Sequence, residues 1–302
     1  MRFIPHLKTF SFVVDEGGAR LDKYVAEKCP QLSRTQVQKL VVQGYITVNG
    51  QVTKAAAKLD VGDRINVAVP PPRPLSSESI PVDIIYEDED LLVVDKPAGL
   101  PVHPAPGHPD HTLVNAVLSH LPRLTDSDPL RPGIVHRLDK DASGVMVMAK
   151  NSVAQANLIN QFKARSVRKA YMVLVRGRLT PENGVIEAPI GRDPHNRKRM
   201  AVVAEGEGKE ARTNYHVVRY LGDYTLLEVK PETGRTHQIR VHLSAIGYAV
   251  AGDTLYGVKS PHLPRQFLHA CRLGFKLPST GKHVEFTSSL PPDLEQALQN
   301  IA

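Results

Sequence analysis

The stretch Gly133-Ile-Val-His-Arg-Leu-Asp-Lys-Asp-Ala-Ser-Gly144 is rich in charged and turn-forming residues and runs directly into the apolar segment Val145–Ala149. A short, continuous apolar run is typical of a strand buried on both faces. We therefore expect the charged stretch at the lip of a buried sheet, where active sites are common. The charge pattern alone favours a simpler interpretation, a solvated turn in which residues 137–141 pair with one another.

Two further stretches carry polar groups into otherwise apolar surroundings. Arg168-Lys-Ala-Tyr171 could be the basic rim of a strand, with Tyr171 as an aromatic residue at the edge of the core. Gly234-Arg-Thr-His-Gln-Ile-Arg-Val-His242 could be a simple helix start, although Arg235 and Arg240 beside two histidines are a heavy polar load for a helix with one apolar face. Spacing alone leaves both interpretations open.

The region around these stretches predicts many strands with interspersed helices. The helix expected at residues 237–246 has Ile239, Leu243 and Ile246 on one face, with Thr236 as its cap and Gly247 at its end. Strands and helices do not alternate regularly, which favours an α+β class with a mainly antiparallel sheet. Other helices are expected at 112–120, 152–162 and 294–301, and strands at 84–86, 91–95, 145–149, 170–175, 215–218, 225–229 and near 186 and 202.

The N-terminal region predicts a small unit of two helices on a short sheet. Residues 20–28 place Leu21 and Val25 on one helical face, and Ser33-Arg-Thr-Gln36 has the spacing of a capping box. Asn49-Gly50 between short apolar runs is a strong hairpin signal, and residues 63–67 can add a strand.

A segment rich in proline and serine separates the two regions. Residues 70–81 have no apolar period and are expected to form an extended, semi-rigid linker. We predict a small basic domain at residues 1–75, with its core at about 18–68, and a larger domain at residues 82–302.

Charge is concentrated in two zones. The chain of 302 residues has a formal net charge of +7, and residues 1–75 hold 11 Lys and Arg against 6 Asp and Glu, which is +5 of that total. Residues 142–181 hold seven basic residues and no acidic one. This distribution fits a partner rich in phosphate.

Several classes of protein lose support from the sequence. It contains no Gly-x-x-x-x-Gly-Lys-Ser/Thr loop, no Gly-x-Gly-x-x-Gly fingerprint, no Gly-x-Ser-x-Gly elbow and no Cys-x-x-Cys pair. Its two cysteines, Cys29 and Cys271, are expected to be free and buried. Neither the histidines at 103, 108 and 111 nor those at 237 and 242 have a convincing metal-ligand pattern, so we expect no metal and no other cofactor.

The apolar runs and the N-terminus suggest where the chain works. No apolar run approaches the roughly 20 residues that span a bilayer, and the N-terminal residues lack the pattern of a signal peptide. We expect a cytoplasmic protein, with a monomer as the default.

Taken together in this order, four stretches resemble a known family, the pseudouridine synthases of the RluA/RluD type. The N-terminal unit is similar to a small RNA-binding module first seen in a ribosomal protein of the small subunit and often fused to such synthases. The stretches that carry the resemblance are Lys96-Pro-Ala-Gly-Leu-Pro-Val-His-Pro104, His136-Arg-Leu-Asp-Lys-Asp-Ala-Ser-Gly144, Lys169-Ala-Tyr171 and Gly234-Arg-Thr-His-Gln-Ile-Arg240.

The resemblance implies an enzyme that converts uridine to pseudouridine in RNA without a cofactor. Asp139 corresponds to the family's catalytic aspartate, which attacks the ribose or the base, and Tyr171 to its active-site tyrosine. Arg235 is taken as the arginine that pairs with the aspartate, and Ile239 as the aliphatic residue that lines the pocket. Ala142 departs from the family pattern, which more often has threonine there.

The same resemblance assigns residues to RNA. The target uridine must leave the base stack, and Arg137 corresponds to the residue that fills the vacated place. The two basic zones are assigned to phosphates. Further candidate contacts to substrate or RNA are His136, Lys169, Arg240, Arg34 and Lys39. Large-subunit ribosomal RNA is the favoured partner, and transfer RNA is the alternative.

Two rival functions follow from the same sequence. A ribosome-assembly factor could keep the fold and lose the chemistry, but it would not need Asp139, Tyr171 and Arg235 together. A different RNA enzyme, such as a methyltransferase, would need a nucleotide-type cofactor site, for which the sequence offers no motif.

Overall fold

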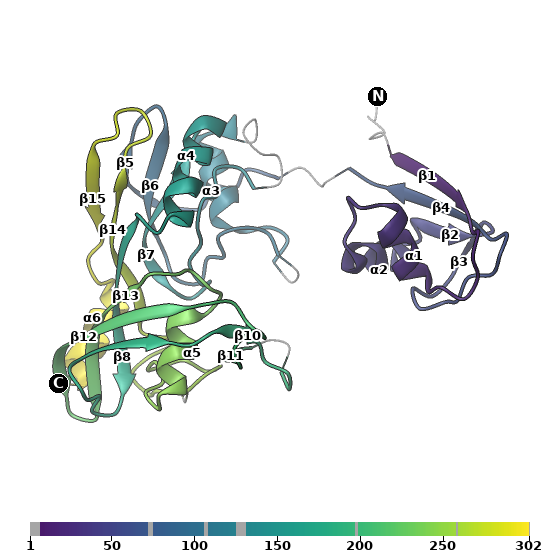
Figure 1. Ribbon diagram of the computed structural model, residues 1–302. Coiled ribbons are helices and arrows are strands. Elements are labelled where there is room, and N and C mark those ends of the chain that lie inside the picture. The colour runs from purple at the N-terminus through teal and green to yellow at the C-terminus, as the bar shows by residue number, and fades with distance from the viewer. Residues whose placement is uncertain are drawn as a thin grey trace. The chain divides into compact units, whose positions relative to one another are not determined.

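The computed structural model describes residues 7–71, 75–105, 108–124, 131–196, 199–257 and 259–301 (Figure 1). The chain divides into two compact units, Met1–Pro74 and Leu75–Ala302, and the division falls inside the expected linker. Residues 72–74 of that linker lie outside the described residues, and its described part contains no helix or strand.

The first unit is a four-stranded antiparallel sheet with two helices. Ser33 accepts a hydrogen bond from the backbone N–H of Gln36 and completes the expected capping box of the second helix. At the hairpin, Asn49 and Gly50 both have positive φ, as a tight turn of this kind requires. The elements are β1 (Lys8–Val13), α1 (Leu21–Lys28), α2 (Arg34–Val42), β2 (Ile46–Val48), β3 (Gln51–Val52) and β4 (Arg64–Val69), in the sheet order β1-β4-β2-β3.

The second unit contains a nine-stranded sheet that is antiparallel except where β14 pairs with β7. This confirms the α+β class. The strands are β5 (Asp83–Glu87), β6 (Leu91–Lys96), β7 (Ser143–Ala149), β8 (Arg168–Arg176), β9 (Asn183–Glu187), β12 (Arg212–Leu221), β13 (Tyr224–Pro231), β14 (Leu268–Lys276) and β15 (His283–Thr287), and β10 (Ile190–Arg192) pairs separately with β11 (Met200–Val202).

Helices cover both faces of this sheet. Val173 and Val175 of β8 belong to the large core that includes residues of α3, α4 and α5, whereas Leu174 between them packs with α6. Because successive side chains of a strand point to opposite faces, α6 covers the face opposite to the other three helices. The helices are α3 (Leu113–His120), α4 (Ser152–Lys163), α5 (Gln238–Ala245) and α6 (Pro292–Ile301).

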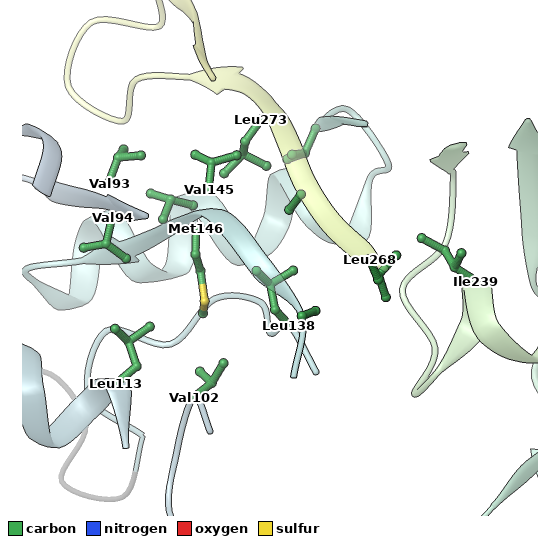
Figure 2. Close-up of a cluster of buried hydrophobic side chains, with 14 of the residues drawn as sticks. Val93, Val94, Val102, Leu113, Leu138, Val145, Met146, Ile239, Leu268 and Leu273 are labelled. Carbon is green, nitrogen blue, oxygen red and sulfur yellow. The ribbon is translucent and has the colours of Figure 1, made fainter. Parts of the chain in front are cut away.

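Strand β7 is the centre of the larger core. All seven of its residues are buried, as expected for its apolar run. Figure 2 shows Val145 and Met146 of this strand among side chains from neighbouring elements, including Val94 and Leu113. The sheet therefore holds the end of the charged stretch against a rigid, dry support.

One expected helix start is wrong. Helix α5 has His237 rather than Thr236 as its N-cap, and His237 adopts a left-handed backbone conformation with φ 55° and gives no side-chain cap. The expected cap of α3 is confirmed, because Thr112 accepts from the backbone N–H of Asn115.

Candidate active site

A pocket of about 490 Å³ lies where the charged stretch meets four other segments. Its walls come from residues 135–142, the C-terminal end of α4, the start of β8, the connection from β13 into α5 and the first residue of β14. Figure 2 shows Leu138, Leu268 and Ile239, three of its apolar wall residues, on separate segments. The volume lies within the usual range for small-ligand pockets, about 300–1,000 Å³.

The segment that carries Asp139 is hydrogen-bonded to the edge of β7. Among the described residues, the pairing of β7 with β14 ends at Gly144, and beyond it the charged stretch pairs with β7 through a bridge between Ile134 and Met148. The backbone N–H of Ala149 donates to the carbonyl of Gly133, and that of Val147 donates to Nε2 of His136. The backbone of this segment is therefore fixed relative to the sheet.

His136, predicted as an RNA contact, joins the pocket wall to α4 and β7. Its ring stacks on Phe162 of α4 with centroids 4.6 Å apart, and its Nε2 accepts the hydrogen bond from β7. Burial lowers the pKa of His136 to about 3, so the ring is neutral at pH 7. A neutral ring is the form that can accept a hydrogen bond from a backbone N–H.

An ion pair holds the carboxylate of Asp139, and its partner differs from the expected one. Nη1 of Arg240 donates to Oδ2 of Asp139 at 2.8 Å. The other edge of the Arg240 guanidinium donates to both oxygens of Asp253, at 2.7 and 2.9 Å. The prediction that Arg235 forms this ion pair is wrong: Arg235 precedes α5, whereas Arg240 lies on the buried face of the helix.

The buried charge of Arg240 is balanced by the two carboxylates that it contacts. The side chains of Arg240 and Asp253 are 9% and 0% exposed, whereas that of Asp139 is 16% exposed. The carboxylates of Asp253 and Asp139 raise the pKa of Arg240 against the opposing effect of burial. The guanidinium therefore stays charged and presents Asp139 to the pocket in a fixed orientation.

Arg235 and Arg137 line the pocket without contacting Asp139 through a hydrogen bond. Nε of Arg235 donates to the carbonyl of Glu210 at 2.9 Å, and the same Glu210 pairs with Arg165 through its side chain. Arg137 is exposed. Both arginines lie at the pocket, and neither holds the carboxylate of Asp139.

Tyr171, Lys169 and Ile239 complete the predicted set. Burial and the negative charge of Asp139 raise the pKa of Tyr171, so its hydroxyl stays protonated at pH 7. Nζ of Lys169 donates to the carbonyl of Thr233, and burial lowers the pKa of Lys169 to about 8. Ile239 is 6% exposed and forms part of the apolar wall.

Lys96 belongs to a stretch that the sequence analysis singled out without assigning it a role. Its side chain is fully buried, and Nζ donates to the carbonyls of Pro97, Leu100 and Lys140 at 2.8–3.1 Å. Burial lowers the pKa of Lys96 to about 7. Since Lys140 follows Asp139 directly, Lys96 fixes the backbone of the segment that carries Asp139.

Gly144 allows the close approach of β7 and β14. Its φ is +117°, and a Cβ at this position would collide with the backbone carbonyl of Ala270. Only glycine therefore fits at the point where the charged stretch enters the sheet.

The remaining predicted contacts, Arg34 and Lys39, lie on α2 of the first unit and not among the pocket residues. Arg34 belongs to a cluster around Asp22, whose side chain is fully buried. Arg20, Arg34 and Gln38 all donate to that carboxylate. The two arginine side chains remain 45% and 50% exposed.

Within the described ranges, no group of three or more His, Cys, Asp or Glu residues has an arrangement that could hold a metal ion. In the same part of the chain no helix is both long and apolar enough to cross a bilayer. Both cysteines are free thiols, Cys29 buried as expected and Cys271 only partly buried.

Three residues in or beside the pocket had no expected role in the site. Asp253 holds Arg240, and Tyr256 contacts His237 through a hydrogen bond of 2.9 Å between its hydroxyl and Nδ1. His237 itself lines the pocket. Asp253 and Tyr256 belong to Ala251-Gly-Asp-Thr-Leu-Tyr-Gly257, a polar and glycine-rich stretch of turns whose position beside the pocket was not foreseen.

Comparison with known proteins agrees with this geometry. Residues 90–245 match the family of RNA pseudouridylate synthases, and residues 19–65 match the S4 domain. An RNA pseudouridine synthase of Chloroflexus aurantiacus is 51% identical over 93% of this chain and 90% of its own. A protein of Zymomonas mobilis named ribosomal large subunit pseudouridine synthase D is 42% identical over 92% of each chain.

Solved structures agree with these sequence matches. The human RNA pseudouridylate synthase domain containing 1 aligns with a TM-score of 0.59 and 30% identity, over 73% of this chain and 89% of that one. The family match covers about half of the chain and includes Asp139, Tyr171 and Arg240. The chain belongs to the RNA pseudouridine synthase family and carries an N-terminal S4 domain.

Proposed function

We propose that this enzyme modifies uridines of large-subunit ribosomal RNA, with Asp139 as the nucleophile. The observation that carries the proposal is the Asp139 carboxylate, which faces a pocket of nucleoside size while Arg240 holds it. A carboxylate can attack directly, without a neighbouring base to activate it.

The reaction exchanges one bond of the nucleotide for another. Attack by Asp139 on the target nucleotide breaks the bond between N1 of uracil and C1′ of the ribose. The freed uracil turns, its C5 bonds to C1′, and the carboxylate is released. The proton on C5 leaves and N1 gains one, so the product is an isomer and no redox partner or metal is required.

Tyr171 contributes as a neutral aromatic group. Its raised pKa opposes a role as the base that takes the C5 proton, because a phenol must first lose its own proton to act so. A protonated tyrosine can stack on the flipped uracil and donate a hydrogen bond. Ile239 and Leu268 provide the apolar walls for the same base.

The basic residues at the pocket fit RNA. Arg137 and Arg235 line the pocket, and Arg165 and Lys163 stand at the end of α4 beside it. Positively charged side chains around an opening can hold the phosphates on either side of a flipped nucleotide. The name of the Zymomonas relative favours large-subunit ribosomal RNA as the substrate.

Release of tritium from RNA labelled at uridine C5 tests the proposal. Transcribed large-subunit ribosomal RNA should release tritium with the wild-type enzyme, and Asp139→Asn should reduce the rate by at least about 1,000-fold because the nucleophile is lost. Asp141→Asn, an exposed aspartate two residues away, is the matched control and should retain the rate.

Two outcomes would contradict the proposal. Undiminished release by Asp139→Asn would remove this residue from the chemistry. Release from transfer RNA but not from ribosomal RNA would reject the assigned substrate.

A further inference from the structure

His237 stands in the wall of the pocket in an unusual backbone conformation. Its φ of 55° and ψ of 21° are left-handed, which costs a non-glycine residue of order 1–3 kcal/mol and persists only where the surroundings impose it. The side chain does not cap α5, so helix capping does not explain the conformation. The charged groups that face the ring are Asp139, Arg240, Asp253 and Arg137.

Tyr256 determines which nitrogen of His237 carries the hydrogen. The Tyr256 side chain is buried, and its hydroxyl accepts a hydrogen bond from the backbone N–H of Met200 at 2.8 Å. Its second partner is Nδ1 of His237 at 2.9 Å. A buried hydroxyl needs an acceptor for its own hydrogen, so the Tyr256 O–H donates to Nδ1 and the hydrogen of the neutral imidazole is on Nε2.

Nε2–H is then a hydrogen-bond donor at the pocket. No residue in the described part of the chain accepts a hydrogen bond from it, while the same ring is held firmly at Nδ1. Burial lowers the pKa of His237, which keeps the imidazole neutral. A fixed neutral donor beside a carboxylate suits an uncharged oxygen of the uracil or ribose better than a phosphate oxygen.

We propose that His237 contacts the substrate by donating a hydrogen bond from Nε2 to an oxygen of the flipped nucleotide, and that Tyr256 is the residue that positions it. This inference rests on the proposed function. The hydrogen bond adds to the positioning of the nucleotide against Asp139, while Tyr256 acts only through the imidazole.

Two substitutions at His237 separate this role from a structural one. A glutamine side chain places its amide N–H near the position of Nε2, whereas an asparagine side chain reaches only the position of Nδ1. Asparagine also tolerates the left-handed backbone better and can still accept from Tyr256. A merely structural histidine would therefore be replaced better by Asn, and a substrate-binding histidine better by Gln.

The single-turnover rate of tritium release from transcribed large-subunit ribosomal RNA is the readout. We expect His237→Asn to be slowed about 10-fold and His237→Gln to remain within about threefold of wild type. His262→Asn, an exposed histidine outside the pocket, should match wild type. Retention of the full rate by His237→Asn, or a loss that follows only the melting temperature of the variants, would overturn the proposal.

Tyr256→Phe provides the second measurement. We expect a loss of about 3- to 10-fold that does not add to the loss in His237→Asn, because both remove the same contact. The nitrogen shifts of the His237 ring in labelled protein should change from the single Nε2–H tautomer to a mixture. Additive losses would refute the positioning role. Absence of release by the wild-type enzyme would reject the proposed function instead.

Discussion

The two units of this chain each contain a buried aspartate that holds arginine, and they use it in opposite ways. In the first unit the buried carboxylate of Asp22 holds Arg20 and Arg34, whose side chains remain about half exposed. In the second unit the buried Asp253 holds Arg240, which is itself almost buried and orients the more exposed Asp139. The first arrangement leaves positive charge at the surface, and the second presents a carboxylate to the pocket.

Removal of Arg240 should have the largest effect on stability and on the reaction rate. Arg240→Met leaves Asp253 buried without its cation and lets Asp139 move, so the unfolding free energy should fall by about 3–5 kcal/mol and the rate by at least about 100-fold. Denaturant titration and tritium release measure the two effects. Arg219→Met, which replaces an exposed arginine of β12 outside the pocket, is the control, with a rate within about threefold of wild type. Equal losses in the two variants would mean that the ion pair does not orient the nucleophile.

Lys96 is a buried basic residue that is held by backbone carbonyls rather than by a carboxylate, unlike the arginines held by Asp22 and Asp253. Lys96→Met leaves three backbone carbonyls without a donor and should lower the unfolding free energy by about 2–4 kcal/mol. The pKa of Lys96 is about 7 in the folded state and about 10.4 in an unfolded chain. Between these values the unfolded chain binds more protons, so the stability that Lys96 contributes increases as the pH rises.

The expected difference in unfolding free energy between wild type and Lys96→Met is therefore smallest at pH 7 and below, and it grows toward pH 10. Denaturant titrations of both proteins at several pH values check this, because other titrating groups cancel in the difference. A difference that shrinks as the pH rises would contradict burial as the cause of the lowered pKa.

The arginines of the first unit should have the smallest effect. Arg34→Ala should weaken RNA binding by about 3- to 10-fold and reduce the slope of log Kd against log salt by about one. Unfolding of the second unit should not change. The control is Arg64→Ala on β4, outside the Asp22 cluster, with a change of less than about twofold. An unchanged salt slope in Arg34→Ala would mean that this arginine does not contact phosphate.

Local signals predicted most of the fold. The capping box at Ser33 and the turn at Asn49-Gly50 each depend on only a few residues. The apolar run of β7 can be recognised without knowing its neighbours in the sheet. Strands β1 and β15 were missed because they are edge strands with mostly exposed or half-buried residues, and so have a weak apolar pattern. Strand β14 was also missed, because its sequence mixes apolar and polar residues. It is buried only because it lies between β7 and β8.

The site was predictable where the residue itself carries the chemistry. Asp139, Tyr171, Lys169 and Ile239 do line one pocket, although their catalytic roles remain predictions. The choice between Arg235 and Arg240 depends on where α5 begins, and the unexpected backbone of His237 sets that start. Asp253 lies far along the chain from Asp139, and only the fold brings it near.

Gly144 limits how this enzyme can diversify. Any side chain there would separate β7 from β14, and the four residues between this point and Asp139 would transmit the shift to the Asp139 carboxylate. Loops around the pocket can change to admit other RNA sequences, but every substitution of Gly144 is expected to disturb the sheet. A mutagenesis library intended to alter the substrate should therefore leave Gly144 unchanged and vary the arginines at the pocket.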